Sequence, residues 1–294
     1  MPGPAIIEAA ITPLRWGAPA QSVDEMVNEA DACIRAGAGI VHHHHDMRLS
    51  EADAVEQLVD TAAGIQAAHP STLVYTDYLT GKRAWEENAH LSPLAERGLL
   101  TMFAIDPGLT TFGSFDRDGI PTRTYVDGLH FGEAHEMIEF SKGIGVPISL
   151  GVFEPGHLRW ILHYEQRVGF FPGTIVKLYF GGRWAVDQTD TQAINFGLPG
   201  TPAALDVYLS MMSDLIPGGS SLPWIASLFG DSMLDSPLAA YALEQGGHLR
   251  VGVEDAAGRS DLTNAQMVER AAEMAASVGR EVVTGTAAKA ALSN

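Results

Sequence analysis

The chain has 294 residues, of which 46% are hydrophobic and 18% are charged. This composition is typical of a folded protein with a large core, and it excludes a disordered chain. The 36 Asp and Glu residues outnumber the 18 Lys and Arg residues, which gives a formal net charge of −18. A chain this acidic repels phosphate backbones and anionic lipids, so we expect neither nucleic acid nor a membrane as partner.

Three features of the sequence bear on the cellular compartment of the protein. No apolar run approaches the ~18 residues of a membrane-spanning helix, and the first residues lack the basic and apolar segments of a signal peptide. Cys33 is the only cysteine, which excludes an intrachain disulfide and a cysteine-based zinc site. We therefore expect a cytoplasmic protein, in which any metal ion is held by histidine and carboxylate side chains.

Strand-like and helix-like segments alternate along the whole chain. Ser22-Val23-Asp24-Glu25 has the pattern of a capping box at the start of the first helix. The expected strands are 6–12, 39–41, 73–75, 99–105, 148–153, 174–180, 223–228 and 249–253, and the helices after the first are 50–67, 133–142, 157–166, 202–215, 237–245 and 264–278. A short hairpin is expected within 112–129.

Helices between most strands imply parallel pairing. Eight such units in this length fit one domain over 1–294, a (β/α)8 barrel with its active site at the C-terminal ends of the strands. A doubly wound open sheet is the alternative.

The second expected strand ends in four histidines, His42 to His45, followed by Asp46. Side chains alternate along a strand, so His42 and His44 share one face and the other two histidines share the opposite face. Two imidazoles on one face can bind a single divalent ion. Parity alone does not decide which pair faces the barrel interior. The alternative is a structural role, with the rings satisfied by backbone hydrogen bonds.

The last expected strand carries a second candidate group. Arg250 and Glu254 share one face, and Asp255 begins the following loop. Glu254 would add a carboxylate to two histidines and leave an open position, as catalytic metal sites do. Asp255 is then a candidate general base, and Arg250 a candidate orienting group or oxyanion partner. The alternative is a structural ion pair between Arg250 and Glu254.

Acidic residues recur at the ends of expected strands, at Asp46, Asp77, Asp106, Glu154 and Asp231. Several carboxylates around one mouth favour a cation, a further metal ion or a substrate that carries an amine. Ordinary loop acids and helix caps are the alternative for each of them.

Two further charged residues belong to the first strand and its end. Glu8 lies inside the expected strand, and a buried carboxylate there needs a partner such as Arg250 or Lys177. Arg15 follows the strand near the expected mouth. The chain has no dinucleotide fingerprint, P-loop or nucleophile elbow, which disfavours nucleotide chemistry and serine hydrolysis.

These motifs resemble the β-keto acid cleavage enzyme family from end to end. The similarity is densest in Gly-Gly-His-Leu-Arg-Val-Gly-Val-Glu-Asp at 246–255, and it includes 36–44, 223–226 and 264–268. The resemblance implies a zinc-dependent barrel, usually a homotetramer, that converts a β-keto acid and acetyl-CoA into acetoacetate and a new CoA thioester. It implies His42, His44 and Glu254 as zinc ligands, Asp255 as the base and Arg250 as the group that orients the keto acid.

The positions that contact substrate in the family differ in this chain. The family pattern has an arginine near Asp46, a hydroxyl-rich strand end near Asp77, an asparagine near Asp106, an acid near Gly151 and an amine-binding glutamate near Arg15, whereas Glu154 matches it. Arg15, Asp77, Asp106 and Glu154 are therefore the candidate substrate-binding residues. An aldolase-like or lyase-like metal enzyme acting on a small oxo acid without CoA remains an alternative, as does a metal-binding barrel without turnover.

Overall fold

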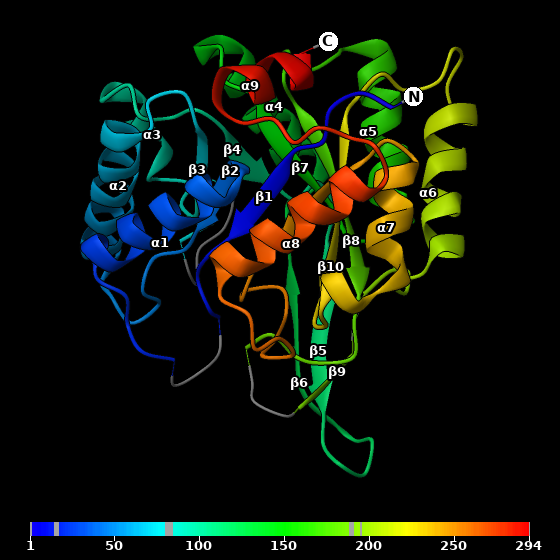
Figure 1. Ribbon diagram of the computed structural model, residues 1–294, viewed down its shortest axis with the longest axis horizontal. Helices are drawn as coiled ribbons and strands as arrows, with labels where there is room; N and C mark the ends of the chain where they lie inside the picture. The colour runs from blue at the N-terminus through cyan, green and yellow to red at the C-terminus, as the bar shows by residue number, and fades with distance from the viewer. Residues whose placement is uncertain (1, 15–17, 80–84, 188–190, 195, 294) are drawn as a thin grey trace.

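The computed structural model describes residues 2–14, 18–79, 85–187, 191–194 and 196–293. Eight parallel strands form a nearly closed barrel with helices around it (Figure 1). The strands are β1 (Ile7–Ala10), β2 (Ala38–His43), β3 (Leu73–Thr76), β4 (Phe103–Ile105), β7 (Ile148–Val152), β8 (Ile175–Gly181), β10 (Trp224–Phe229) and β11 (His248–Val251). They pair in the order β3-β2-β1-β11-β10-β8-β7-β4, so the predicted barrel is confirmed and the open doubly wound sheet is wrong.

One side-chain hydroxyl connects β3 and β4, the two strands at the ends of this order; the gap between them is called the seam below. The Thr101 Oγ1 atom, just before β4, accepts a hydrogen bond from Val74 N at 2.8 Å and donates one to Val74 O at 2.9 Å. The predicted fourth strand began at Leu99, but the structure begins it at Phe103. The residues before β4 are irregular, and one side chain there takes the place of a ladder of backbone hydrogen bonds.

Helices cover the outside of the barrel. They are α1 (Val23–Ala36), α2 (Glu51–Ala68), α3 (Leu91–Glu96), α4 (Phe131–Ile144), α5 (Pro155–Arg167), α6 (Pro202–Asp214), α7 (Pro237–Glu244), α8 (Asn264–Ser277) and α9 (Gly285–Ser293), with a 3-10 turn, η1 (Met233–Asp235). The predicted capping box is present, because Ser22 Oγ accepts from Glu25 N while the Glu25 carboxylate accepts from Ser22 N. No described helix is long and apolar enough to cross a membrane.

The sequence did not predict α3 and α9. The first is six residues long and contains Pro93, and the second is rich in alanine, so neither has a clear amphipathic period. Ala288 and Leu292 of α9 pack against an apolar layer at the N-terminal end of the barrel interior. The members of that layer are Ile6, Ile40, Leu73, Tyr75, Met102, Ile175 and Ile225. This end of the barrel is therefore closed by packing, and polar side chains begin one layer further along the strands.

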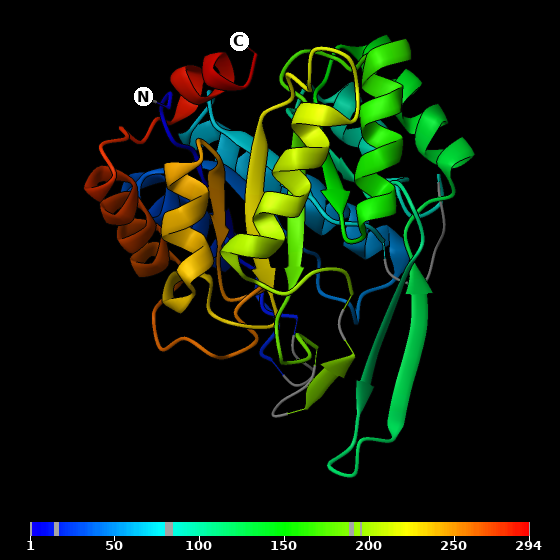
Figure 2. The same ribbon diagram turned by 90° about the vertical axis from the view of Figure 1, so that its right-hand side faces the viewer.

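A three-stranded antiparallel sheet stands apart from the barrel. It consists of β5 (Thr110–Phe115), β6 (Pro121–Asp127) and β9 (Gln192–Ile194), in the order β6-β5-β9. The β5–β6 hairpin confirms the hairpin predicted within 112–129. Figures 1 and 2 show that it projects as an arm beyond the C-terminal ends of the barrel strands.

Candidate metal centre

Three buried side chains converge at the C-terminal end of the barrel. His42 Nε2 lies 3.1 Å from His44 Nε2, and Glu254 Oε2 lies 3.4 and 3.3 Å from these two nitrogen atoms. Atoms that bind one tetrahedral zinc ion at 2.0–2.1 Å stand about 3.3–3.4 Å apart. Each of the three residues is 3% exposed. The spacing therefore fits a single ion bound by all three atoms.

The chemistry of the donor atoms also suits a cation. Glu254 Oε2 is buried and accepts no hydrogen bond from the described residues. It faces two imidazole nitrogens, and groups with lone pairs that converge on one point are stabilised by a positive charge between them. Two nitrogens and one carboxylate oxygen suit zinc and also other divalent transition metals.

Glycine at position 252 lets the chain direct Glu254 to the histidines. The last expected strand extended to Val253, but β11 ends at Val251 and Glu254 lies in the turn that follows. A Cβ atom on Gly252 would lie 2.0 Å from the Ala10 carbonyl oxygen, so only glycine allows β11 to pass β1 this closely. On the other edge of β1, Ala10 pairs with His42, so the C-terminal end of β1 lies between Gly252 and the histidines.

An acid lies behind one of the two histidines. Asp77 Oδ2 is 3.0 Å from His44 Nδ1, the ring nitrogen that points away from Glu254. Burial alone would lower the pKa of His44, but the carboxylates of Asp77 and Glu254 raise it. A carboxylate next to the second nitrogen of a metal-binding histidine fixes the ring and raises its basicity. Asp77, predicted to bind substrate, thus also contacts a candidate ligand.

Arg250 is fully buried and organises the acids of the site. Its Nη1 atom donates to Glu8 Oε1 at 2.8 Å and to Tyr75 Oη at 3.2 Å. Its Nε and Nη2 atoms each donate to the Asp255 carboxylate at 2.9 Å, and Nη2 also donates to Glu254. The structural Arg250–Glu254 ion pair, weighed above as an alternative to the metal site, therefore exists alongside the three converging donors.

A polar layer lies beneath the converging donors. Glu8 Oε1 accepts hydrogen bonds from Tyr75 Oη at 2.5 Å, Lys177 Nζ at 2.7 Å and Arg250. The prediction that Glu8 pairs with Arg250 or Lys177 is confirmed for both cations. Although burial alone would raise it, these cations lower the pKa of Glu8 to about 2. The Tyr75 ring also lies 4.5 Å from the His42 ring, centroid to centroid, and supports it.

Ser227 is a member of the site that the sequence analysis missed. It lies on β10, is fully buried, and donates from Oγ to Asp255 Oδ2 at 2.5 Å. Asp255 itself is 1% exposed. The one available signal was that Ser227 interrupts an otherwise apolar strand, Trp-Ile-Ala-Ser-Leu-Phe.

Asp106 reaches into space left by a missing side chain. A Cβ atom on Gly151 would lie 1.9 Å from Asp106 Oδ1. The family resemblance places an acid near position 151, and here the carboxylate of a neighbouring strand occupies that space instead. Burial, together with the charges of Asp77 and Asp127, raises the pKa of Asp106 to about 7. Asp106 can therefore exchange a proton near neutral pH.

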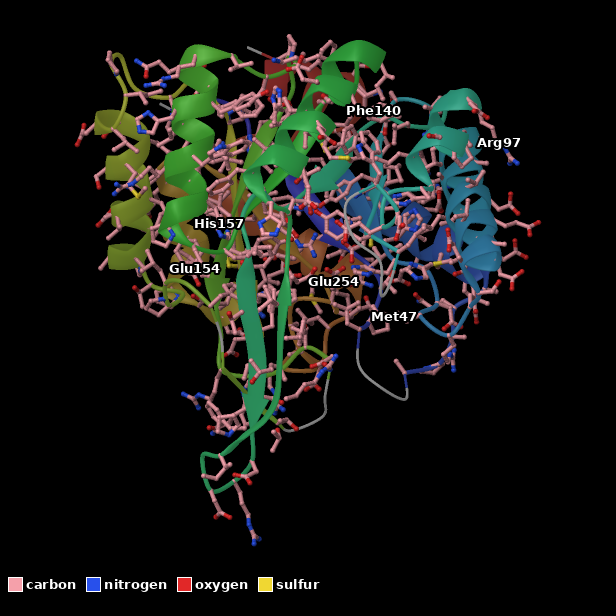
Figure 3. All side chains as sticks on the ribbon, turned by 180° about the vertical axis from the view of Figure 1, so that it is seen from behind. Met47, Arg97, Phe140, Glu154, His157 and Glu254 are labelled. Atoms are coloured by element: carbon pink, nitrogen blue, oxygen red, sulfur yellow. The ribbon has the colours of Figure 1, made fainter. Side chains whose placement is uncertain are left out.

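The other predicted site residues have different neighbours. Glu154 Oε1 accepts from Gly197 N at 3.0 Å at the start of α5 and so ties two loops together. Figure 3 shows Glu154 beside α5 and apart from Glu254. Asp46 pairs with the exposed Arg48 at 2.8 Å, Asp231 Oδ1 accepts from the backbone nitrogen of the next residue, and Arg15 lies outside the described residues.

A cavity of ≈ 140 Å³ opens beside His44, one of the three candidate ligands. His44 and His45 form one wall, and the loop after β1 contributes Thr12 and Leu14. Because it adjoins His44, this cavity gives a small molecule a place next to one of the three candidate ligands.

Comparison with known proteins gives consistent matches. The model of a family described as beta-keto acid cleavage enzyme matches residues 4–293. The chain is 27% identical to the 3-keto-5-aminohexanoate cleavage enzyme of Fusobacterium nucleatum, over 98% of this chain and 96% of that enzyme. It is 27% identical to the 3-oxoadipate:acetyl-CoA acetyltransferase of Cupriavidus necator, over 99% of this chain and 95% of the other.

Among solved structures, the chain is similar to ObcA in complex with oxaloacetate. The TM-score is 0.68 at 13% sequence identity, and the similarity covers 93% of this chain and 66% of the longer ObcA chain. A likeness at this identity supports the barrel fold.

Proposed function

Because the chain belongs to the β-keto acid cleavage enzyme family, we propose that it is a zinc-dependent enzyme acting on a small β-keto acid and acetyl-CoA. The products would be acetoacetate and a new CoA thioester. The observation that carries this proposal is the triangle of His42 Nε2, His44 Nε2 and Glu254 Oε2, with sides of 3.1 to 3.4 Å.

The proposed reaction exchanges two acyl groups. The bond between carbons 2 and 3 of the keto acid breaks, and the two-carbon fragment with the carboxylate joins the acetyl group as acetoacetate. The remaining acyl group leaves on the CoA sulfur. The names of both relatives specify an acid with a keto or oxo group at carbon 3, and one of them specifies acetyl-CoA.

The proposed roles follow from the contacts. When bound at His42, His44 and Glu254, a zinc ion would polarise the ketone oxygen and stabilise negative charge on it. Asp255 follows Glu254 in the chain, and we assign it the removal of the proton from carbon 2. Each nitrogen of the Arg250 guanidinium already donates to a protein oxygen, so we assign Arg250 to positioning Asp255 and Glu254.

The substrate-binding residues follow in the same way. Asp77, which lies beside His44, and Asp106 would contact the substrate. Glu154 would act indirectly, because it holds the Gly197 backbone at 3.0 Å. Arg15 stays a predicted contact for the substrate.

The alternative reaction without CoA was motivated by the acids at positions 46, 77 and 106. Two of these acids have partners in the chain, since Asp46 pairs with Arg48 and Asp77 lies against His44. This weakens the reason to expect a different substrate class. Titration of acetyl-CoA by calorimetry separates the two reactions, because the aldolase-like or lyase-like enzyme would bind no acyl-CoA.

Hydrogen exchange distinguishes the proposed enzyme from a barrel that binds metal without turnover. Uptake of deuterium at carbon 2 of a 3-keto acid, dependent on Asp255 and seen by NMR, would exclude it.

Metal analysis tests the proposal. We expect about one zinc ion per wild-type chain and loss of both zinc and acetoacetate formation in His42→Ala. His43→Gln is the matched control, because this neighbour lies on the opposite face of β2 by alternation and should leave the metal content unchanged. A His42→Ala protein with full zinc content and full activity would contradict the proposal.

A further inference from the structure

The outer edge of the arm formed by β5 and β6 has no partner strand among the described residues. The sheet order β6-β5-β9 places β6 at an edge, and Figure 2 shows this strand on the outer side of the arm. All seven residues of β6 are exposed. A free edge presents unpaired backbone N–H and C=O groups, and natural proteins usually protect such edges.

Apolar side chains are exposed along the same arm. Val126 on β6 is 55% exposed, and Ile120 at the hairpin tip is 60% exposed. Leu109 and Phe131, which flank the base of the arm, are also exposed. Exposed apolar groups on a projecting element are available for contact with a partner.

The sequence of β6 is complementary to itself in one antiparallel register. If two copies pair about a two-fold axis at Tyr125, Arg123 of each copy lies opposite Asp127 of the other, and Thr124 lies opposite Val126. A two-fold axis at Arg123 or at Asp127 would place like charges opposite each other, and an axis at Thr124 or Val126 would form no Arg–Asp pair. Directly opposed side chains of opposite charge stabilise antiparallel pairs, and like charges destabilise them.

We infer that β6 pairs with β6 of a second copy of this chain, in the register centred on Tyr125. The interface is isologous, as in most two-fold dimers. Within one chain Arg123 already binds Asp187, but a guanidinium has five donors and can serve a second carboxylate. The same register carries Ile120 of the second copy toward the base of the arm, where Leu109 and Phe131 are exposed.

The base of the arm connects this interface to the barrel mouth. Leu129 N donates to Asp106 O at 2.9 Å, and Gly108 N donates to Leu129 O at 2.9 Å. Pairing of the arms would therefore immobilise a segment hydrogen-bonded to Asp106. The interface itself does not depend on the proposed chemistry.

Charge reversal on β6 tests the inference. We expect the mass of wild type, by size-exclusion chromatography with light scattering, to be an even multiple of 31.4 kDa. Either single reversal, Arg123→Asp or Asp127→Arg, places like charges opposite each other at two positions of the interface. We expect each to weaken association about tenfold or more and so to halve the mass. The double variant, Arg123→Asp with Asp127→Arg, recreates both pairs in reverse and should restore the mass.

Asp187→Asn is the matched control. It removes the partner of Arg123 within the chain but leaves the edge of β6 unchanged, so it should assemble as wild type does. A monomeric wild type would overturn the inference, and so would single reversals with wild-type mass or a double variant without recovery. Loss of assembly in Asp187→Asn would mean that the ion pair within the chain, and not the edge of β6, controls assembly. This result would also overturn the inference. Because all of β6 is exposed, each variant should keep the wild-type circular dichroism spectrum.

Discussion

Ser227 Oγ lies 2.5 Å from Asp255 Oδ2, and both residues are buried. Arg250 donates to both oxygens of the same carboxylate, from 2.9 to 3.1 Å. Asp255 is thus held by donors from two neighbouring strands, β10 and β11. A carboxylate fixed in this way keeps one orientation toward the adjacent Glu254, which suits a base that must meet a proton in one position.

Replacement of Ser227 should impair proton removal and leave metal binding intact. In Ser227→Ala, Asp255 loses one donor, and a lost hydrogen bond to a charged group costs about 1.5–3 kcal/mol, equivalent to a rate loss of tenfold or more. We expect deuterium uptake at carbon 2 of a 3-keto acid to slow by about this factor, with unchanged zinc content. Ser227→Thr keeps the hydroxyl and should recover most of the rate. An alanine variant with the wild-type exchange rate would show that Ser227 has a packing role only.

The site residues predicted from the sequence follow from rules that apply to a single strand or to the common edge of parallel strands. The contacts that were missed depend on how two strands are aligned with each other. His42 and His44 were predicted as a pair because alternation within one strand fixes which side chains share a face, and Glu254 because parallel strand ends meet at one edge. The Ser227–Asp255 and Gly151–Asp106 contacts, which were missed, run between strands, and the register that creates them is not readable from either strand alone. The barrel was predictable for the same reason as the histidine pair, since its strands and helices have local periods.

Gly151 and Asp106 should be energetically coupled. Gly151→Ala places a methyl group 1.9 Å from Asp106 Oδ1, and overpacking of this kind destabilises a core by about 1–3 kcal/mol. In an Asp106→Ala background the carboxylate is absent, so the added methyl group should cost much less. Urea unfolding of the four proteins gives the coupling energy. Equal costs in both backgrounds would mean that the Asp106 carboxylate simply moves aside.

Asp106 should make the protein less stable as the pH rises toward neutral. Its pKa is raised from 3.8 to about 7 in the folded protein, so the folded state binds this proton more tightly than the unfolded state does. The resulting stability is fully present below pH about 4 and is lost as the pH rises to about 7. Asp106→Asn should remove this loss between pH 4 and 7, measured by urea unfolding with a chelator present. The exposed Asp118→Asn is the control and should follow wild type, and an Asp106→Asn profile parallel to wild type would contradict the assignment.

Thr101 should contribute to stability through the seam between β3 and β4. Its Oγ1 atom makes two hydrogen bonds to the Val74 backbone, at 2.8 and 2.9 Å, where the strands themselves form no ladder. Thr101→Val keeps the shape of the side chain but leaves Val74 N and O without this partner, which should cost about 1–3 kcal/mol of the free energy of unfolding. Thr101→Ser retains the hydroxyl and should cost less. Hydrogen exchange at the Val74 amide measures the effect locally, and protection in Thr101→Val equal to wild type would mean that another group bridges the seam.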